Sequence, residues 1–218
     1  MVVTILIFDR LTALDAIGPY EVFAAVPGWT VEFVAPKAGP QRTDSGATAL
    51  VADRGIDEVD VTDVLLVPGG EGNRPLLQDE GLLGWIREID AGSRYTTSVC
   101  TGSLLLGAAG LLRGRRATSH WLYRDQLRDF GAEPVADRVV EDGKLMTAAG
   151  VSAGIDLALR LVEREVGPSI AQAVQLAIEY DPQPPFDAGS PEKAPPEVVE
   201  VVRSFSGPGD EWLGAQRG

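Results

Sequence analysis

The sequence predicts an α/β protein, a three-layer sandwich in which helices cover both faces of a mainly parallel central sheet. Two observations support this fold class. Strand-like and helical segments alternate along most of the chain. The composition, 44 % hydrophobic and 23 % charged over 218 residues, is ordinary for a protein with one large core. We therefore expect one domain over residues 1–218, with ligands binding at the carboxyl ends of the strands.

The predicted parallel strands are four runs rich in β-branched residues, which lie at residues 2–8, 30–35, 64–67 and 95–99. A hairpin follows later in the chain, where residues 139–141 and 144–147 flank an Asp142-Gly143 pair. This pair favours the tight turns in which both central residues have positive φ. We therefore predict a β-hairpin at these residues.

Helices are predicted between the strands. Gly18 and Pro19 punctuate the first helix, whereas Asp79 is placed to cap a helix that Gly92 closes. Pro168 is placed to open a helix that runs to Tyr180. A long helix precedes it, with apolar residues at helical spacing: Ile155, Ala158, Leu159, Val162 and Val166.

The chain changes character after residue 180. Residues 181–196 hold six of the 15 prolines, which favours an extended wrap around the body or a subunit contact over a second domain. We treat residues 181–218 as a Pro-rich C-terminal extension of the single domain.

Charge and residue counts exclude several classes of function. A net charge of −13 disfavours binding to nucleic acid, and one histidine with one cysteine cannot form the usual zinc sites, so we expect no metal. The longest apolar and small-residue run, 104–112, is about half of what spans a membrane. The first residues lack a secretory signal, and a lone thiol suits a reducing compartment, which together predict a cytoplasmic protein.

Cys100 is the strongest candidate for chemistry. The segment Ser98-Val99-Cys100-Thr101-Gly102 follows a strand and precedes a leucine-rich helix, as in a nucleophile elbow. A helix N-terminus favours thiolate over thiol, so we expect a lowered Cys100 pKa. The alternative is a buried structural cysteine, but the strand, glycine and helix around Cys100 favour the nucleophile.

Three further residues lie where strands are expected to end. Asp15 follows the first strand and could move protons, although an N-cap role is an equally good interpretation. Gly70 follows the strand at 64–67, and its backbone N–H with that of Thr101 would form a donor pair for developing negative charge. The alternative for Gly70 is a plain turn.

His120 is the only imidazole in the chain and invites a Cys–His pairing. A half-buried histidine with ordinary hydrogen bonds is equally compatible with its residue type, and its spacing does not decide between them. Val151 is a further residue that we expect near the site.

Together these motifs resemble the ThiJ/PfpI superfamily, with its class I glutamine amidotransferase-like (flavodoxin-like) sandwich, and within it the isocyanide hydratases most closely. The resemblance covers nearly the whole chain. It rests on the following segments: Leu14-Asp15 with Gly18-Pro19, Pro68-Gly69-Gly70, Ser98-Val99-Cys100-Thr101-Gly102-Ser103, Gly114-Arg115-Arg116-Ala117-Thr118 with His120-Trp121, Ala153-Gly154-Ile155-Asp156, Pro184-Pro185-Phe186 and Ala188-Gly189-Ser190-Pro191.

The resemblance implies a homodimer, a Cys100 nucleophile and a nearby acid at Asp15. It implies hydration of an organic isocyanide to an N-substituted formamide through a covalent cysteine thioimidate, with Thr101 assisting and without a cofactor. Peptidase-like members carry histidine where this chain has Thr101, which weakens a peptidase assignment. Two alternatives stay open: a glyoxalase- or deglycase-like enzyme acting on α-oxoaldehydes, and a non-enzymatic redox-sensing or ligand-binding domain.

Overall fold

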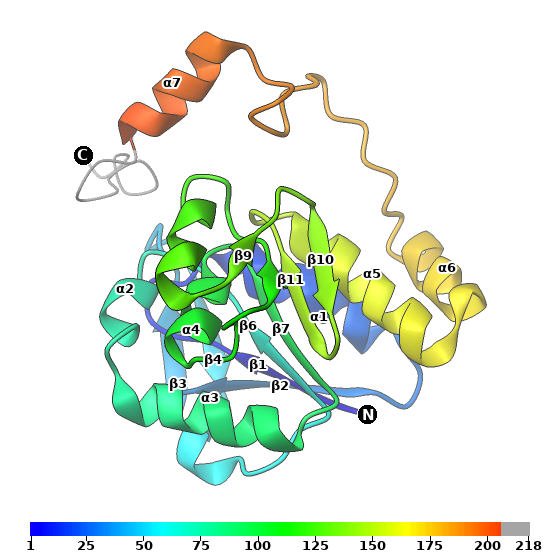
Figure 1. The fold of residues 1–218 in the computed structure, drawn as a ribbon. Coiled ribbons are helices and arrows are strands. Elements are labelled where there is room, and N and C mark those ends of the chain that lie inside the picture. Colours follow the sequence, from blue (N-terminus) through cyan, green and yellow to red (C-terminus); the bar gives the residue numbers. More distant parts are fainter. Residues whose placement is uncertain (206–218) are drawn as a thin grey trace.

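A seven-stranded sheet forms the centre of the computed structural model, which describes residues 1–205 (Figure 1). All neighbouring strands are parallel except the β10–β11 hairpin, so the sheet is mainly parallel as predicted. In spatial order the strands are β10 (Val139–Asp142), β11 (Leu145–Ala148), β7 (Tyr95–Val99), β6 (Val64–Val67), β1 (Val2–Leu6), β2 (Thr30–Ala35) and β5 (Arg54–Gly55).

Helices cover both faces of the sheet, which completes the three layers (Figure 1). One layer contains α1 (Ala13–Ala24), α5 (Ala153–Val166) and α6 (Pro168–Ala177), in which α5 packs against both neighbours. The other contains α2 (Asn73–Leu76), α3 (Glu80–Gly92), α4 (Gly102–Ala108) and the 3₁₀ helix η2 (Arg124–Phe130), with α4 contacting the other three. Within residues 1–205, no helix has the length and apolar character to cross a membrane.

Several local signals match the structure. The Asp79 carboxylate accepts a hydrogen bond from the Leu82 N–H at the start of α3, and Pro168 is the first residue of α6. Helix α6 ends at Ala177 rather than Tyr180. Helix α1 continues through Gly18 and Pro19, and a Cβ at Gly18 would lie 3.0 Å from the Ile155 side chain. Gly18 therefore permits α1 to pack closely on α5.

The small elements outside the main sheet were not predicted. They are the hairpin β3 (Gly39–Arg42) and β4 (Ala49–Ala52), the short pair β8 (Arg116–Ala117) and β9 (Glu133–Pro134), the 3₁₀ turn η1 (Ile56–Glu58), and the helices α2 and η2. Most of them span two to four residues, too few for a hydrophobic period to develop. Their positions depend on contacts with the rest of the fold.

An extended segment leaves α6 and leads to α7 (Pro196–Phe205), which lies apart from the sheet in Figure 1. We call residues 181–195 the arm. The Arg203 guanidinium lies 5.7 Å from the centre of the Trp121 ring, which links α7 to the body. Residues 206–218 of the predicted extension lie outside the described residues. The assignment of one domain to the whole chain stays a prediction.

Candidate active site

Cys100 lies on a sharp turn between β7 and α4, at the carboxyl edge of the sheet. Its φ of 57° is in the left-handed region, which is rare for a residue with a side chain. Its N–H donates to the carbonyl oxygens of Ala148 and Ala149, at 3.2 and 2.9 Å. A Cβ at Gly102 would collide with the Val67 carbonyl oxygen, so only glycine lets the chain reverse here.

Asp15 points into the same edge from the first turn of α1, and its side chain is completely buried. Its Oδ2 accepts a 2.8 Å hydrogen bond from the Gly69 N–H, whereas its Oδ1 has no hydrogen-bonding partner among the described residues. Thr12 occupies the N-cap position, so the interpretation of Asp15 as the cap of α1 is wrong. The carboxyl group instead joins α1 to the loop after β6.

The proton affinity of Asp15 is high. Burial raises its pKa from 3.8 to about 8, because a charged carboxylate loses its hydration there. The Gly69 hydrogen bond opposes this shift, and the nearby Asp44 carboxylate reinforces it. Asp15 therefore holds a proton for most of the time near neutral pH.

The Cys100 pKa differs from the sequence expectation. Burial, with the side chain only 6 % exposed, raises the thiol pKa well above its ordinary value, and the Asp15 charge raises it further. The backbone N–H groups of Val151 and Thr101 interact with the sulfur and oppose the shift. The expected lowering was wrong because the loss of hydration outweighs the two backbone N–H groups.

The backbone donors around the sulfur also differ from the expected pair. The Gly70 N–H donates to the Thr101 hydroxyl at 3.1 Å, so it is engaged within the protein. The donors at the sulfur belong to Thr101 and Val151, and Val151 has an unusual φ of 26°. Gly69 completes the site, since a Cβ there would lie 2.5 Å from Thr101 Oγ1 and 3.1 Å from Asp15 Oδ2.

His120 lies beside the site but is not among the groups that shift the Cys100 pKa. A Cβ at Gly150 would lie 2.7 Å from the imidazole, which places the ring against the residue that precedes Val151. Its Nδ1 accepts from the Leu122 N–H at 3.4 Å. This half-buried ring fits a packing role next to the loop after β11.

Several residues that support the turn were not singled out from the sequence. The hydroxyls of Ser103 and Ser119 donate to the Cys100 carbonyl oxygen at 3.3 and 3.0 Å, and the Asn73 amide donates to that of Thr101 at 2.9 Å. Its position directly after Pro68, at the end of β6, could have identified Gly69. Ser103 lies in the turn itself, whereas Ser119 and Asn73 come from distant segments and carry no local signal.

No group of three or more histidine, cysteine, aspartate or glutamate side chains that could hold a metal occurs within residues 1–204. The groups that the structure brings together at this edge are a thiol and a carboxyl group. One protonated acid, one thiol and two N–H groups converge on one point.

Comparisons with known proteins agree with the predicted family and fold. A model of the DJ-1/PfpI family matches residues 1–164. An isonitrile hydratase from Pseudomonas putida is 49 % identical over 203 residues, which cover 93 % of this chain and 89 % of that protein. A crystal structure of a ThiJ/PfpI family protein from Pseudomonas syringae has a TM-score of 0.90 at 39 % identity, covering 98 % of this chain and 90 % of that one. The structure of Drosophila melanogaster DJ-1beta shares the fold alone. Its TM-score is 0.73 at 20 % identity, covering 82 % of this chain and 97 % of that one.

Proposed function

The chain belongs to the DJ-1/PfpI family, and from this premise we propose that it hydrates organic isocyanides (isonitriles) to N-substituted formamides. Cys100 is the nucleophile and Asp15 is the group that moves protons. The reaction adds water across the terminal carbon, which makes the enzyme a hydro-lyase. The proposal needs no cofactor, because the two side chains and water supply every atom.

One observation carries the proposal: a carboxyl group with a pKa of about 8 lies beside the only thiol of the chain. An isocyanide carbon must gain both a proton and a nucleophile. A protonated Asp15 can supply the first and Cys100 the second. The Asp15 carboxyl group interacts with the Cys100 side chain, so the proton donor and the nucleophile are adjacent.

In the first half-reaction Asp15 gives its proton to the terminal carbon of R–NC. The Cys100 sulfur then bonds to that carbon, and the thiol proton passes to the Asp15 carboxylate. The product is the thioimidate R–N=CH–S–Cys100, and Asp15 is protonated again. This order explains how a thiol with a raised pKa reacts, because no thiolate has to form beforehand.

In the second half-reaction Asp15 protonates the thioimidate nitrogen and then accepts a proton from the attacking water. The intermediate R–NH–CH(OH)–S–Cys100 collapses as the carbon–sulfur bond breaks. The hydroxyl proton passes through Asp15 to the leaving sulfur, which gives R–NH–CHO and the free thiol. The N–H groups of Thr101 and Val151 stabilise negative charge on that sulfur.

The test is turnover of an alkyl isocyanide by the purified protein, with the formamide measured by liquid chromatography and mass spectrometry. Acid quenching during turnover should trap a protein mass increased by that of the substrate. The Cys100→Ala variant is the control for both signals. Formamide release by the alanine variant at the wild-type rate would refute the covalent route.

The alternative enzyme class is distinguished in the same experiment. A glyoxalase- or deglycase-like enzyme would consume methylglyoxal, whose carbonyl carbon accepts the thiol as a hemithioacetal. Turnover of methylglyoxal in preference to the isocyanide would replace our proposal. The redox-sensor alternative is weakened by the burial of Cys100, because oxidation to sulfenic acid follows exposure and thiolate character.

We also propose that the protein is cytoplasmic and that it forms a homodimer. A cytoplasmic location suits a nucleophile that has to stay reduced. A homodimer, implied by the family resemblance, would give the extended arm of residues 181–195 a surface to cover. Light scattering of the purified protein tests the second prediction, and a monomeric mass would contradict it.

A further inference from the structure

We propose that Arg138 is a positioning residue for Cys100. Arg138 holds the loop of residues 149–152 in place from outside the site. This inference deepens the proposed function, because the loop supplies a backbone donor to the nucleophile. Arg138 itself does not contact the sulfur. Its effect passes through the backbone.

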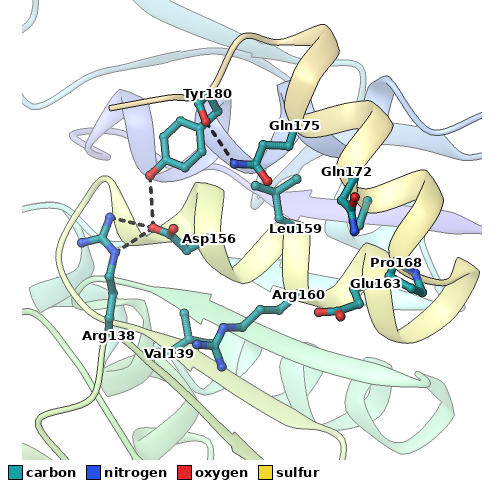
Figure 2. Close-up of a pocket in the computed structure, with 11 residues that line it drawn as sticks. Arg138, Val139, Asp156, Leu159, Arg160, Glu163, Pro168, Gln172, Gln175 and Tyr180 are labelled. Atoms are coloured by element: carbon teal, nitrogen blue, oxygen red, sulfur yellow. Dashed lines mark hydrogen bonds and ion pairs between the residues drawn. The ribbon is translucent and has the colours of Figure 1, made fainter. Parts of the chain in front are cut away.

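Arg138 lies in a cleft of about 300 Å³ between β10, α5 and α6 (Figure 2). The cleft is on the outside of the molecule, and the Arg138 side chain is 48 % exposed. Figure 2 shows its guanidinium directed at Asp156, which also receives a bond from the Tyr180 hydroxyl at 3.3 Å. Tyr180 immediately precedes the arm.

The main chain of Arg138 holds one end of the loop. The Ala149 N–H donates to the Arg138 carbonyl oxygen at 2.9 Å, and the Ala149 carbonyl oxygen accepts from the Cys100 N–H at 2.9 Å. Two consecutive backbone hydrogen bonds therefore connect Arg138 to the nucleophile.

The side chain of Arg138 holds the other end. Its Nη2 donates to Ser152 Oγ at 3.2 Å, and its Nε donates to Asp156 Oδ2 at 2.7 Å in the first turn of α5. Ser152 makes no side-chain cap bond to α5, so its hydroxyl is committed to Arg138. Val151 lies between the two held ends.

Val151 needs such support. It is β-branched, and its φ of 26° is unfavourable for any residue with a Cβ. Its N–H interacts with the Cys100 sulfur and favours the charged form of the thiol. Strained backbone persists only where its surroundings hold it, and Arg138 holds both sides. Because the Arg138–Asp156 pair is partly exposed, its contribution to global stability is small.

The single cysteine gives a test that does not depend on the substrate. The rate of alkylation by iodoacetamide is measured from pH 7 to 12 for wild type, Arg138→Gln and Ser152→Ala, a range that extends into strong base because burial raises the thiol pKa. The pH of half-maximal rate reports ionisation separately from access. Arg160→Gln is the matched control, since Arg160 lines the same cleft on α5 but has no bond to Ser152 or Asp156 among the described contacts.

We expect Arg138→Gln to raise the pH of half-maximal alkylation by roughly half a unit to one unit, the effect of weakening one hydrogen bond to the charged sulfur. Below that pH the rate should fall about threefold to tenfold. Ser152→Ala should shift in the same direction by less, and Arg160→Gln should not shift. The kcat for isocyanide should fall in parallel, with KM little changed.

Wild-type alkylation profiles in both Arg138→Gln and Ser152→Ala would overturn the inference, and so would a lower melting temperature with unchanged thiol reactivity. If Arg138→Gln does not fold, Ser152→Ala decides alone, because it removes only an exposed hydroxyl. Should the wild type fail to hydrate isocyanides, the proposed function fails while the alkylation profiles still decide the role of Arg138.

Discussion

Asp15 and Asp142 each accept one backbone hydrogen bond, yet their proton affinities shift in opposite directions. Asp142, at the end of β10, accepts from the Arg116 N–H at 3.0 Å, and its pKa is lowered by that bond and by the Arg115 guanidinium. Asp15 accepts from the Gly69 N–H at 2.8 Å, and its pKa is raised to about 8. The hydrogen bonds are alike, so the surroundings make the difference.

The comparison separates hydrogen bonding from hydration. Asp142 keeps contact with water, with 24 % of its side chain exposed, and has a cation beside it. Asp15 has neither, and its charged neighbour is Asp44, a second acid. One backbone N–H cannot replace the hydration that a buried carboxylate loses. Asp15 thus stays protonated because it is buried away from water and has an acid rather than a cation as its charged neighbour.

The largest effect on turnover should come from removing the Cys100 thiol, which lies beside the protonated Asp15. Cys100→Ala should lose isocyanide turnover by at least about 10⁴-fold, because the chain has no second thiol to replace the nucleophile. Circular dichroism should be unchanged, since the side chain is small. Formamide release within tenfold of wild type in the folded variant would remove the nucleophile from the mechanism.

The paired substitutions Asp15→Asn and Asp142→Asn test the comparison directly. Asparagine retains the shape but cannot transfer a proton, so Asp15→Asn should lower kcat by about 10²- to 10⁴-fold. Asp142→Asn should stay within about twofold, because it removes a surface charge pair. Equal effects of the two variants on kcat would show that burial does not distinguish the aspartates functionally.

The two aspartates should also give opposite pH dependences of stability. The folded Asp15 pKa of about 8 exceeds the unfolded value of 3.8, so folded protein binds this proton more tightly. Its contribution is fully present below pH 3.8 and is lost as pH rises toward 8. Asp15→Asn should therefore gain stability over wild type by an amount on the order of a few kcal/mol at pH 8.

For Asp142 the sign is reversed. Its folded pKa is lowered, so its contribution is present above the unfolded pKa and is lost as pH falls through the folded one. Asp142→Asn should lose stability near neutral pH and converge with wild type in acid. Urea unfolding at pH 5 and 8 measures the Asp15 trend, and a further measurement near pH 2 measures that of Asp142. A stability difference between Asp142→Asn and wild type that persists unchanged near pH 2 would contradict the assignment.

A smaller effect is expected from Asp44, whose charge reinforces the raised Asp15 pKa. Asp44→Asn keeps an oxygen to accept the 2.8 Å hydrogen bond from the Thr12 hydroxyl but removes the charge. The Asp15 pKa should fall, so the alkaline limb of kcat/KM should move to lower pH by less than about one unit. A limb that stays in place would separate Asp44 from the proton at Asp15.

A limited effect is expected from His120, which packs beside the loop that follows β11. His120→Asn should retain turnover within about tenfold of wild type, below the general acid–base range expected for Asp15. A loss as large as that of Cys100→Ala would restore the Cys–His pairing and shift the assignment toward amidase chemistry. Steady-state kinetics with the same isocyanide decides this.

The sequence alone was sufficient for features that depend on local chemistry. The alternation of β-branched runs with amphipathic segments predicted the layered sheet, and strand–Cys100–glycine–helix predicted the turn that carries the thiol. Asp79 and Pro168 marked the starts of α3 and α6. These predictions succeed because a helix cap or a sharp turn is determined by residues within a few positions of one another.

Only the tertiary structure decided the protonation of the site and the identity of its backbone donors. From the sequence, Asp15 was equally compatible with a helix cap, and Cys100 was expected to have a lowered pKa. Burial in the folded protein raises the pKa of both groups. The Val151 N–H reaches the sulfur from a loop some 50 positions along the chain. Desolvation is the sum over every atom that displaces water, and those atoms come from strands and helices that only folding brings together.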